Sequence, residues 1–280
     1  MPELTEKKVF PAVHRCIYCG RHGKNIKLGD EHIVPFGLGG KLVLPKASCD
    51  RCGKITGATI ERQCLRNMFG QLRIRSNYPT RRKKERPETL PMSVETEGRI
   101  EFVEAPVNRR PHATIMFAFP RPGILAGLTP EESANVRLPG LWFYGQQDEA
   151  ARLWTKENYP DAKRHGAVAS FHPVLFQKML AKIAHSFAVA EIGYGKFNPL
   201  LPKAIIGEAP WQPGYLVGGN PNEPPPSEYI NEIGFRNQVS IKGQPYLVVR
   251  IRLFANLGAP TYYVVVSDLR FLSAAPTQKR

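Results

Sequence analysis

The sequence predicts an α+β protein with two parts, a small N-terminal module fixed by cysteines and a larger mixed region after it. The first part is indicated by two cysteine pairs, Cys16/Cys19 and Cys49/Cys52, and by the helical spacing of apolar residues that follows them. The second part is indicated by alternating strand patterns around one long apolar helix. A chain of 280 residues can form one large or two modest domains.

The two Cys-x-x-Cys pairs indicate a metal site, because four thiolates make a tetrahedral set that suits Zn²⁺. The pairs are separated by 29 residues, positions 20–48, so a substantial insert lies between them. The alternatives are disulfides or unrelated buried thiols. Disulfides need an oxidising compartment, and the N-terminal sequence has no apolar segment of signal-peptide length. Structural zinc and a cytoplasmic location are therefore favoured.

Short strands are expected around residues 28–34 and 40–45 of this module, and a helix over roughly residues 54–74. The helix is indicated by apolar residues at helical spacing, Ile55, Ile60, Met68 and Leu72. Cys64 lies on the same apolar face. It is expected to be a core residue and not a fifth ligand.

Between the cysteine pairs, a carboxylate and an imidazole stand side by side at Glu31 and His32. A histidine is suited to take a proton from water at neutral pH, and a carboxylate is suited to bind a hard divalent cation. Side chains alternate across a strand, so the two can share a site only if the strand ends or bulges there. Pro35 and Gly37 favour such an end. A lone histidine would more often be structural, but its position beside Glu31 favours chemistry.

This chain resembles the zinc-stapled branch of the HNH endonucleases, also called His-Me finger or ββα-metal nucleases, at Cys16–Cys19, Glu31–Pro35, Leu38–Gly40, Leu44–Cys49 and Cys52. The resemblance covers about residues 13–75. It implies that His32 is the general base and Glu31 a ligand of a catalytic divalent metal, Mg²⁺ or Mn²⁺. It also implies phosphodiester hydrolysis in nucleic acid, and we expect double-stranded DNA.

The sequence departs from the family pattern at two positions. Gly53 stands directly after the last cysteine, where many relatives have Asn, and Leu44 stands at the middle Asn. Either Thr56 or Glu61 supplies the missing oxygen ligand, or the site is degenerate and the protein only binds nucleic acid. The first alternative is favoured, because Glu31 and His32 would otherwise have little reason to be adjacent inside the cysteine staple.

The charge of the chain favours a polyanionic partner. The formal net charge is +15 and the pI about 9.7, and residues 1–110 hold 22 Lys+Arg against 12 Asp+Glu. The densest basic part is either a solvated linker or a phosphate contact, which its place next to the proposed site favours; it consists of Arg73, Arg75, Arg81, Arg82, Lys83, Lys84 and Arg86. The expected nucleic-acid contacts are Arg62, Arg66, Arg73, Arg81, Arg82, Lys83 and Lys84.

The chain is expected to divide into a leader (1–12), the cysteine module (13–76), a basic, proline-containing linker (77–90) and an α+β domain of open role (91–280). In the last part, strands are expected at 92–96, 99–104, 112–119 and 138–144, a core helix at 173–191, a loop at 208–228, and an antiparallel hairpin of 246–255 with 261–268. His185, on the core helix, is expected to be a packed or partly exposed side chain and not a ligand.

Several classes of protein are disfavoured by what the sequence lacks. It has no apolar run of transmembrane length, no repeat, no phosphate-binding glycine loop and no nucleotide-cofactor fingerprint. A thiol-redox protein is disfavoured because no βαβ pattern surrounds either cysteine pair. The sequence therefore favours a metal-dependent HNH-type endonuclease. The alternative is a non-catalytic zinc-containing protein that binds nucleic acid.

Overall fold

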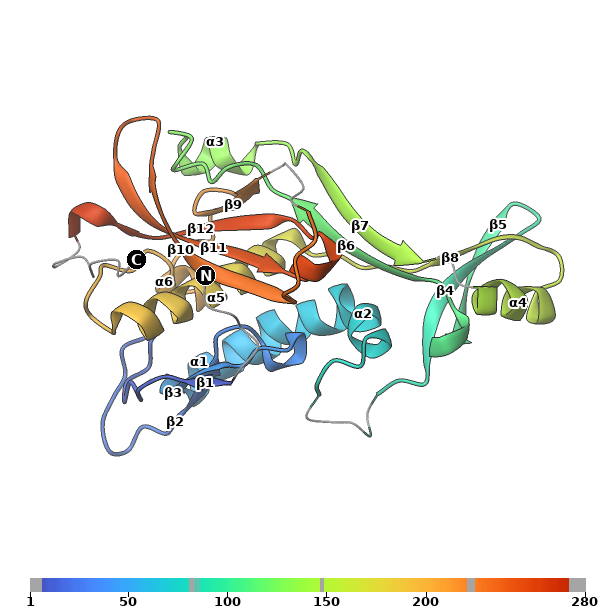
Figure 1. Ribbon diagram of the computed structural model, residues 1–280, viewed down its shortest axis with the longest axis horizontal. Coiled ribbons are helices and arrows are strands. Elements are labelled where there is room, and N and C mark those ends of the chain that lie inside the picture. The colour runs from blue at the N-terminus through green and yellow to red at the C-terminus, as the bar shows by residue number, and fades with distance from the viewer. Residues whose placement is uncertain (1–6, 81–83, 85, 147–148, 221–224, 272–280) are drawn as a thin grey trace.

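The computed structural model describes residues 7–80, 84, 86–146, 149–220 and 225–271 and has a mixed α+β architecture. Figure 1 shows a body formed by the two ends of the chain and an arm formed by its middle. Within the described residues, no helix is both long and apolar enough to cross a membrane.

The N-terminal module is a small sheet followed by a long helix. Its strands β1 (Lys8–Val9), β2 (Leu28–His32) and β3 (Leu42–Cys49) lie in the order β1-β3-β2, with β2 antiparallel to β3. The expected strand pair is confirmed. The short helix η1 (Phe36–Leu38) joins these strands. Lys8–Val9, expected in a leader of uncertain order, is the third strand of this sheet.

The helix of the module begins earlier than expected, at Asp50. It comprises α1 (Asp50–Lys54), η2 (Ile55–Glu61) and η3 (Cys64–Met68), and α2 (Gly70–Arg75) follows after a break at Phe69. The segments η2 and η3 are π-helical. π-Helical turns are rare in proteins, and those that occur often lie at functional sites. The last residue of η2 is Glu61, one of the candidate ligands.

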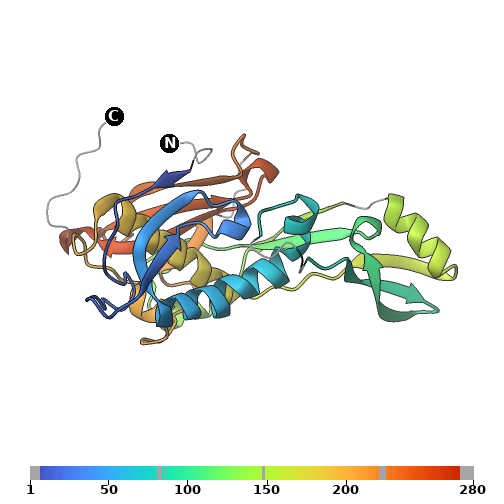
Figure 2. The ribbon, with the colours of Figure 1, turned by 90° about the horizontal axis from the view of Figure 1, so that it is seen from below.

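The core helix of the body is α5 (Pro173–Ile192), as the sequence predicts. Proline in its first turn and Gly193 at its end, with φ 106°, are typical of helix boundaries. Its residues are apolar on most sides, as expected of a helix that is covered all round. It contacts β9, β11 and β12 on one side and η2 and η3 on the other. Figure 2 shows the same arrangement from below.

The sheet that covers α5 is antiparallel, with strands in the order β10-β11-β12-β9. Its strands are β9 (Val217–Asn220), β10 (Asn231–Val239), β11 (Pro245–Leu253) and β12 (Thr261–Asp268). The pairing of β11 with β12 confirms the expected hairpin, and the helix η6 (Ala255–Leu257) joins them. Beyond β12 lies η7 (Leu269–Phe271), and α6 (Pro202–Ile205) follows α5.

The expectation of a loop over residues 208–228 is wrong at β9. This strand contains Gly218 and Gly219, which weaken any strand pattern in the sequence. The structure shows why glycine stands there. A Cβ on Gly218 would lie 2.4 Å from the carbonyl oxygen of Pro120 and from the nitrogen of Pro122. The close approach of two backbone segments therefore determines the residue type.

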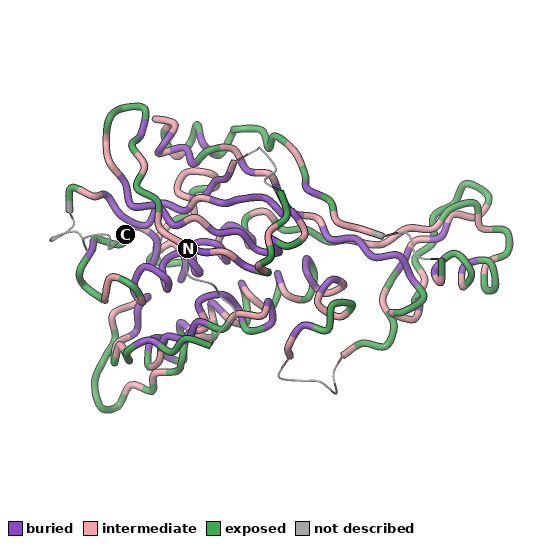
Figure 3. The backbone as a smooth tube through the Cα atoms, in the orientation of Figure 1, coloured by how far each residue is buried: buried purple, intermediate pink, exposed green. Residues whose placement is uncertain are grey.

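The arm consists of a two-stranded ribbon and a small sheet at its end (Figure 1). The ribbon pairs β6 (His112–Ala118) with β7 (Gly140–Gln146), and the sheet has the order β5-β4-β8. Its strands are β4 (Thr89–Thr96), β5 (Arg99–Pro106) and β8 (Ala162–Ala167). Between β5 and β8 the chain also forms the helices η5 (Val107–Arg109), α3 (Pro130–Ala134) and α4 (Glu149–Asn158). Figure 3 shows that buried residues are concentrated in the body.

One hydrophobic core joins the N-terminal module to the C-terminal sheet. It runs from Phe10 to Val266 and includes Cys16, Leu38 and Phe69 of the module. The ring of Phe69 lies 5.9 Å from that of Phe176 on α5 and 5.2 Å from that of Phe254. The module is therefore packed into the body.

Replacing Gly40 with alanine is expected to destabilise the turn between β2 and β3. An added Cβ would lie 1.8 Å from the carbonyl oxygen of Val34, and overpacking of this kind costs about 1–3 kcal/mol. Chemical denaturation would measure the loss. Gly57→Ala is the matched control, because no atom lies within 4 Å of its added Cβ. Equal stability of the two variants would contradict the packing argument.

Candidate functional site

Four cysteine sulfurs gather at the start of the long helix of the module. Cys16 and Cys19 lie on a turn closed by a 2.9 Å hydrogen bond from the nitrogen of Gly20 to the carbonyl oxygen of Cys16. Cys49 is the last residue of β3, and Cys52 lies in α1. The ligand atoms of the four cysteines all lie within 4.8 Å of one another.

This cluster fits a zinc ion. Sulfurs around a tetrahedral Zn²⁺, with Zn–S of about 2.3 Å, are about 3.8 Å apart. The Sγ atoms of Cys19 and Cys49 are 3.7 Å apart. All five cysteines of the chain are free thiols, so the disulfide alternative is not realised. The fifth, Cys64, is fully buried in the core as expected. Burial raises the pKa of its thiol to about 12.

Glu31 and His32 are the last two residues of β2, opposite Leu44 and Val43 of β3. A register shift precedes them, between Gly29 and Glu31. Glu31 is buried, whereas His32 is half-buried. The His32 ring makes an edge contact with the ring of Phe36, 5.7 Å between centroids. The two predicted site residues are therefore adjacent in the chain and differ in their access to solvent.

The buried carboxylate of Glu31 contacts a lysine that lies outside the module. Lys182, on α5, is 1% exposed, and its Nζ lies 2.5 Å from Oε1 of Glu31 and 2.7 Å from Oε1 of Glu61. It also donates to the carbonyl oxygen of His32 and, at 3.4 Å, to that of Ile33. An ammonium has three N–H donors, and all three are matched here by acceptors. We call Glu31, Lys182 and Glu61 the carboxylate–lysine cluster.

The pKa directions in this cluster follow from two carboxylates sharing one ammonium. Burial by itself would lower the pKa of Lys182, but Glu31 and Glu61 hold it above its usual value. Burial raises the pKa of Glu31. The Lys182 ammonium opposes this rise and the second carboxylate, Glu61, adds to it. The lysine is therefore charged.

The hydroxyl of Tyr18 completes the surroundings of the cluster. Tyr18 lies between the first two cysteines and is 4% exposed, and its buried hydroxyl interacts with the carboxylate of Glu31. Burial raises the pKa of this phenol well above its usual value, and the charges of Glu31 and Glu61 raise it further. Tyr18 thus brings a polar atom close to two carboxylates.

The residues present do not fit a divalent ion held by Glu31 and Glu61. Their side-chain oxygens converge, as a shared metal site would require, but the Lys182 ammonium lies at the point of convergence. Thr56, the other candidate for the missing ligand, is buried and donates from Oγ1 to the carbonyl oxygen of Cys52, 3.1 Å away. Gly53 offers no side-chain ligand.

The predicted nucleic-acid contacts differ in their surroundings. Arg62 and Arg66 are exposed on the helix of the module, and Lys84 is also exposed. Arg73 is partly buried and donates to the carbonyl oxygens of Gly37 at 2.7 Å and Leu65 at 2.9 Å, a structural contact. The remaining three, Arg81, Arg82 and Lys83, lie outside the described residues.

Besides Lys182, a second polar side chain of α5 contacts the N-terminal module, at the turn that carries Cys16 and Cys19. His185 is 1% exposed, and its Nε2 lies 2.8 Å from the carbonyl oxygen of Ile17, between Cys16 and Cys19. Burial lowers its pKa to about 4, so the ring is neutral at pH 7 and donates from Nε2. Of the two expected placements, packed or partly exposed, the structure shows the packed one.

Sequence reasoning missed Lys182 and Tyr18. One signal could have indicated Lys182, because it is a charged residue on an otherwise apolar helix face between Met179 and Ile183. Lysine is almost never fully buried unless it is paired. A buried lysine therefore implies carboxylate partners, and Glu31 and Glu61 are two of the few acidic residues in the module.

The paired strands, the four-cysteine cluster and the following helix define a module of the ββα type with a possible zinc site. Comparison with known families agrees, because residues 16–69 match the family of HNH endonucleases. The resemblance inferred from residues 13–75 is confirmed, and the N-terminal part of the chain carries an HNH endonuclease domain. No curated protein and no solved structure matched the chain.

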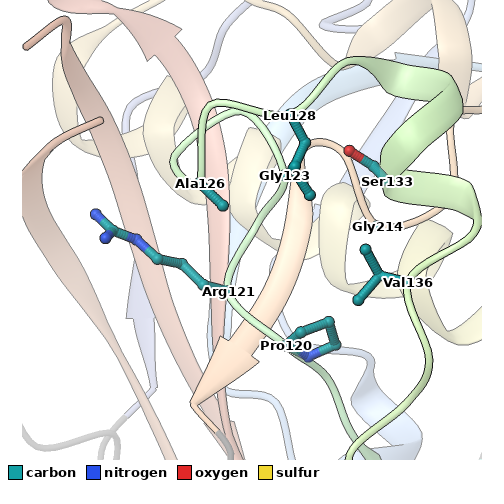
Figure 4. A pocket seen from close by; sticks show the side chains of 8 residues that line it. All are labelled: Pro120, Arg121, Gly123, Ala126, Leu128, Ser133, Val136 and Gly214. Atoms are coloured by element: carbon teal, nitrogen blue, oxygen red, sulfur yellow. The ribbon is translucent and has the colours of Figure 1, made fainter. Parts of the chain in front are cut away.

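A hollow elsewhere on the body carries no comparable chemistry. It has a volume of about 160 Å³ and is lined by Pro120, Arg121, Gly123, Ala126, Leu128, Ser133, Val136 and Gly214 (Figure 4). Its lining has no carboxylate, histidine or cysteine, and Arg121 donates to the carbonyl oxygen of Val239. The residues with candidate chemistry described above lie in the module and on α5.

Proposed function

We propose that the protein is an HNH-type endonuclease that hydrolyses phosphodiester bonds in nucleic acid, with double-stranded DNA as the expected substrate. One observation carries the proposal. In a segment that matches the HNH endonucleases, His32 ends strand β2, which pairs with the strand that ends at Cys49, and it is only half-buried.

In this proposal His32 is the general base. A half-buried imidazole is suited to accept the proton of an attacking water at neutral pH. The backbone around it is held in place by the pairing of β2 with β3 and by the hydrogen bond from Lys182 to the His32 carbonyl oxygen. We assign a structural Zn²⁺ to Cys16, Cys19, Cys49 and Cys52.

Divalent metal ions supply Lewis acidity and charge neutralisation in phosphodiester hydrolysis. Because the Glu31–Glu61 pair holds the Lys182 ammonium, the proposed role of His32 does not depend on a metal at that pair. The test of cleavage is a plasmid-nicking assay with zinc-loaded protein, run with Mg²⁺, with Mn²⁺ and with neither. Nicking that co-purifies with the protein and needs His32 supports the proposal.

The second candidate function is binding of nucleic acid without cleavage. The specific observation that favours it is the carboxylate–lysine cluster, together with Gly53 and Leu44 at positions where side-chain amides would be expected. Binding of plasmid DNA with no nicking under any of the three metal conditions would favour this candidate.

The distribution of charge favours the module as the surface for nucleic acid. Residues 1–86 hold 19 Lys+Arg against 7 Asp+Glu, whereas residues 87–170, which include the arm, hold 9 against 11. Phosphate contacts supply most of the sequence-independent affinity for DNA. We therefore place the proposed DNA contact on the helix that carries Arg62 and Arg66, and near the basic run that ends at Arg86.

Neutralising Arg62 and Arg66 with glutamine is expected to weaken binding to duplex DNA of any sequence. Each lost phosphate contact flattens the slope of log affinity against log salt concentration by about 0.9. Fluorescence anisotropy of labelled duplex DNA at several salt concentrations would measure this slope. The matched control is Lys163→Gln with Arg164→Gln, which removes two exposed charges from β8 in the arm. Equal slopes in the two double variants would refute the assignment of the surface.

A further inference from the structure

The cation between the carboxylates of Glu31 and Glu61 is a side chain of the protein, the ammonium of Lys182. Both Oε1 atoms lie at ion-pair distance from the Lys182 Nζ, 2.5 and 2.7 Å, and two backbone carbonyl oxygens, of His32 and Ile33, face the same ammonium. These four oxygens form the kind of donor set that binds hard divalent cations. Here they surround a nitrogen.

The ammonium and a divalent ion cannot occupy this place together. Mg²⁺ binds oxygen at about 2.0–2.1 Å and Ca²⁺ at about 2.3–2.6 Å, so either ion would have to take the position of Nζ. The ammonium and the metal ion are both positive, and at such a short distance in this buried place they would repel each other strongly. Binding of a metal therefore requires Lys182 to leave the two carboxylates.

The surroundings of Lys182 oppose its departure. Its side chain is 1% exposed, and its chain neighbours Ala181 and Ile183 are fully buried in the core. The helix packs against the C-terminal sheet on one side and against η2 and η3 on the other. An ammonium displaced from the carboxylates would remain in this interior without partners, which is strongly unfavourable.

We propose that Lys182 is the resident cation of this site and excludes divalent metal from the Glu31–Glu61 pair. The lysine thus replaces the metal that the resemblance to the family implies for Glu31. The proposal concerns cation binding alone and holds for either candidate function, cleavage or binding without cleavage.

The exclusion of metal by Lys182 can be tested by removing the charge of this side chain. Without the ammonium, the oxygens of Glu31 and Glu61 and the two carbonyl oxygens would surround a vacant position lined by two carboxylates. Such a donor set suits Mg²⁺, Mn²⁺ or Ca²⁺. Removing the charge of Lys182 is therefore expected to create a divalent-cation site.

The experiment is a Mn²⁺ titration of the full-length, zinc-loaded protein, followed by the electron paramagnetic resonance signal of free Mn²⁺. Wild type and Glu61→Gln are expected to bind Mn²⁺ equally. Lys182→Met is expected to bind one additional Mn²⁺ per chain, and the double variant Lys182→Met/Glu61→Gln is expected to lose it. Lys178→Met is the matched control, because it makes the same substitution one turn earlier on α5 and should behave as wild type.

The melting temperature provides a second measurement. Added Mn²⁺ should raise it in Lys182→Met, because a ligand that binds only the folded state stabilises that state, and should leave wild type unchanged. A wild type that binds one Mn²⁺ and loses it in Glu61→Gln would overturn the proposal. This comparison decides the question even if Lys182→Met does not fold, and it needs no nuclease activity.

Discussion

Replacing His32 with alanine is expected to lower the rate of DNA nicking by about 10²–10⁴-fold, the usual contribution of a general base. The imidazole acts only on the attacking water in the proposed reaction, so DNA affinity and zinc content should stay unchanged. The measurement is the nicking rate of wild type and variant at saturating protein. His32 lies at the end of β2 and is half-buried, so its truncation should leave the fold intact.

The control for this prediction is His22→Ala, which removes an exposed histidine of the same module and should nick at the wild-type rate. Equal rates of wild type and His32→Ala would refute the role of His32 as base. If wild type itself does not nick under any metal condition, binding without cleavage becomes the better account of the domain.

Replacing Cys49 with serine is expected to have the largest effect on stability. The variant removes one of four thiolates, and zinc binding in small sites contributes about 10–16 kcal/mol to folding at pH 7. We expect zinc to fall from one equivalent to well below one, and residues 13–76 to lose protection from hydrogen exchange first. Elemental analysis and hydrogen exchange followed by mass spectrometry would measure the two effects.

Cys64→Ser is the matched control for this prediction. It makes the same substitution at a buried cysteine that is not part of the cluster, so it should lose stability through core packing and keep one zinc per chain. Zinc content below one equivalent in carefully purified wild type would contradict the zinc assignment. Full zinc content in Cys49→Ser would show that this thiolate is not a ligand.

The local parts of the candidate site could be predicted from the sequence. Cysteine spacing, the Glu31-His32 pair and the period of the following helix each depend on residues close together in the chain. The hairpin of β11 with β12 and the helix α5 were equally visible, because their apolar patterns are long and regular. Strand β9 was hidden by two glycines that only a neighbouring backbone segment explains.

The pairing of Glu31 with Lys182 could not be predicted from the local pattern around Glu31, for a physical reason. A carboxylate next to a histidine has the same local pattern whether it faces a metal or a buried ammonium. The difference lies in Lys182, which is 150 residues from His32 in the chain and meets the module only through packing of α5. Patterns of spacing carry no information about such a contact.

The contacts from α5 determine when, during synthesis of the chain, the N-terminal domain can finish folding. Lys182 and His185 reach back over 150 and 168 residues to the backbone at His32 and Ile17. Proteins are synthesised from the N-terminus, and contacts between distant residues form late. While the ribosome makes the segments in between, Glu31 has no counter-charge and the cysteine turn lacks the histidine that supports it. The mature nuclease-like domain therefore becomes complete only when translation has passed α5, although its own sequence ended more than a hundred residues earlier.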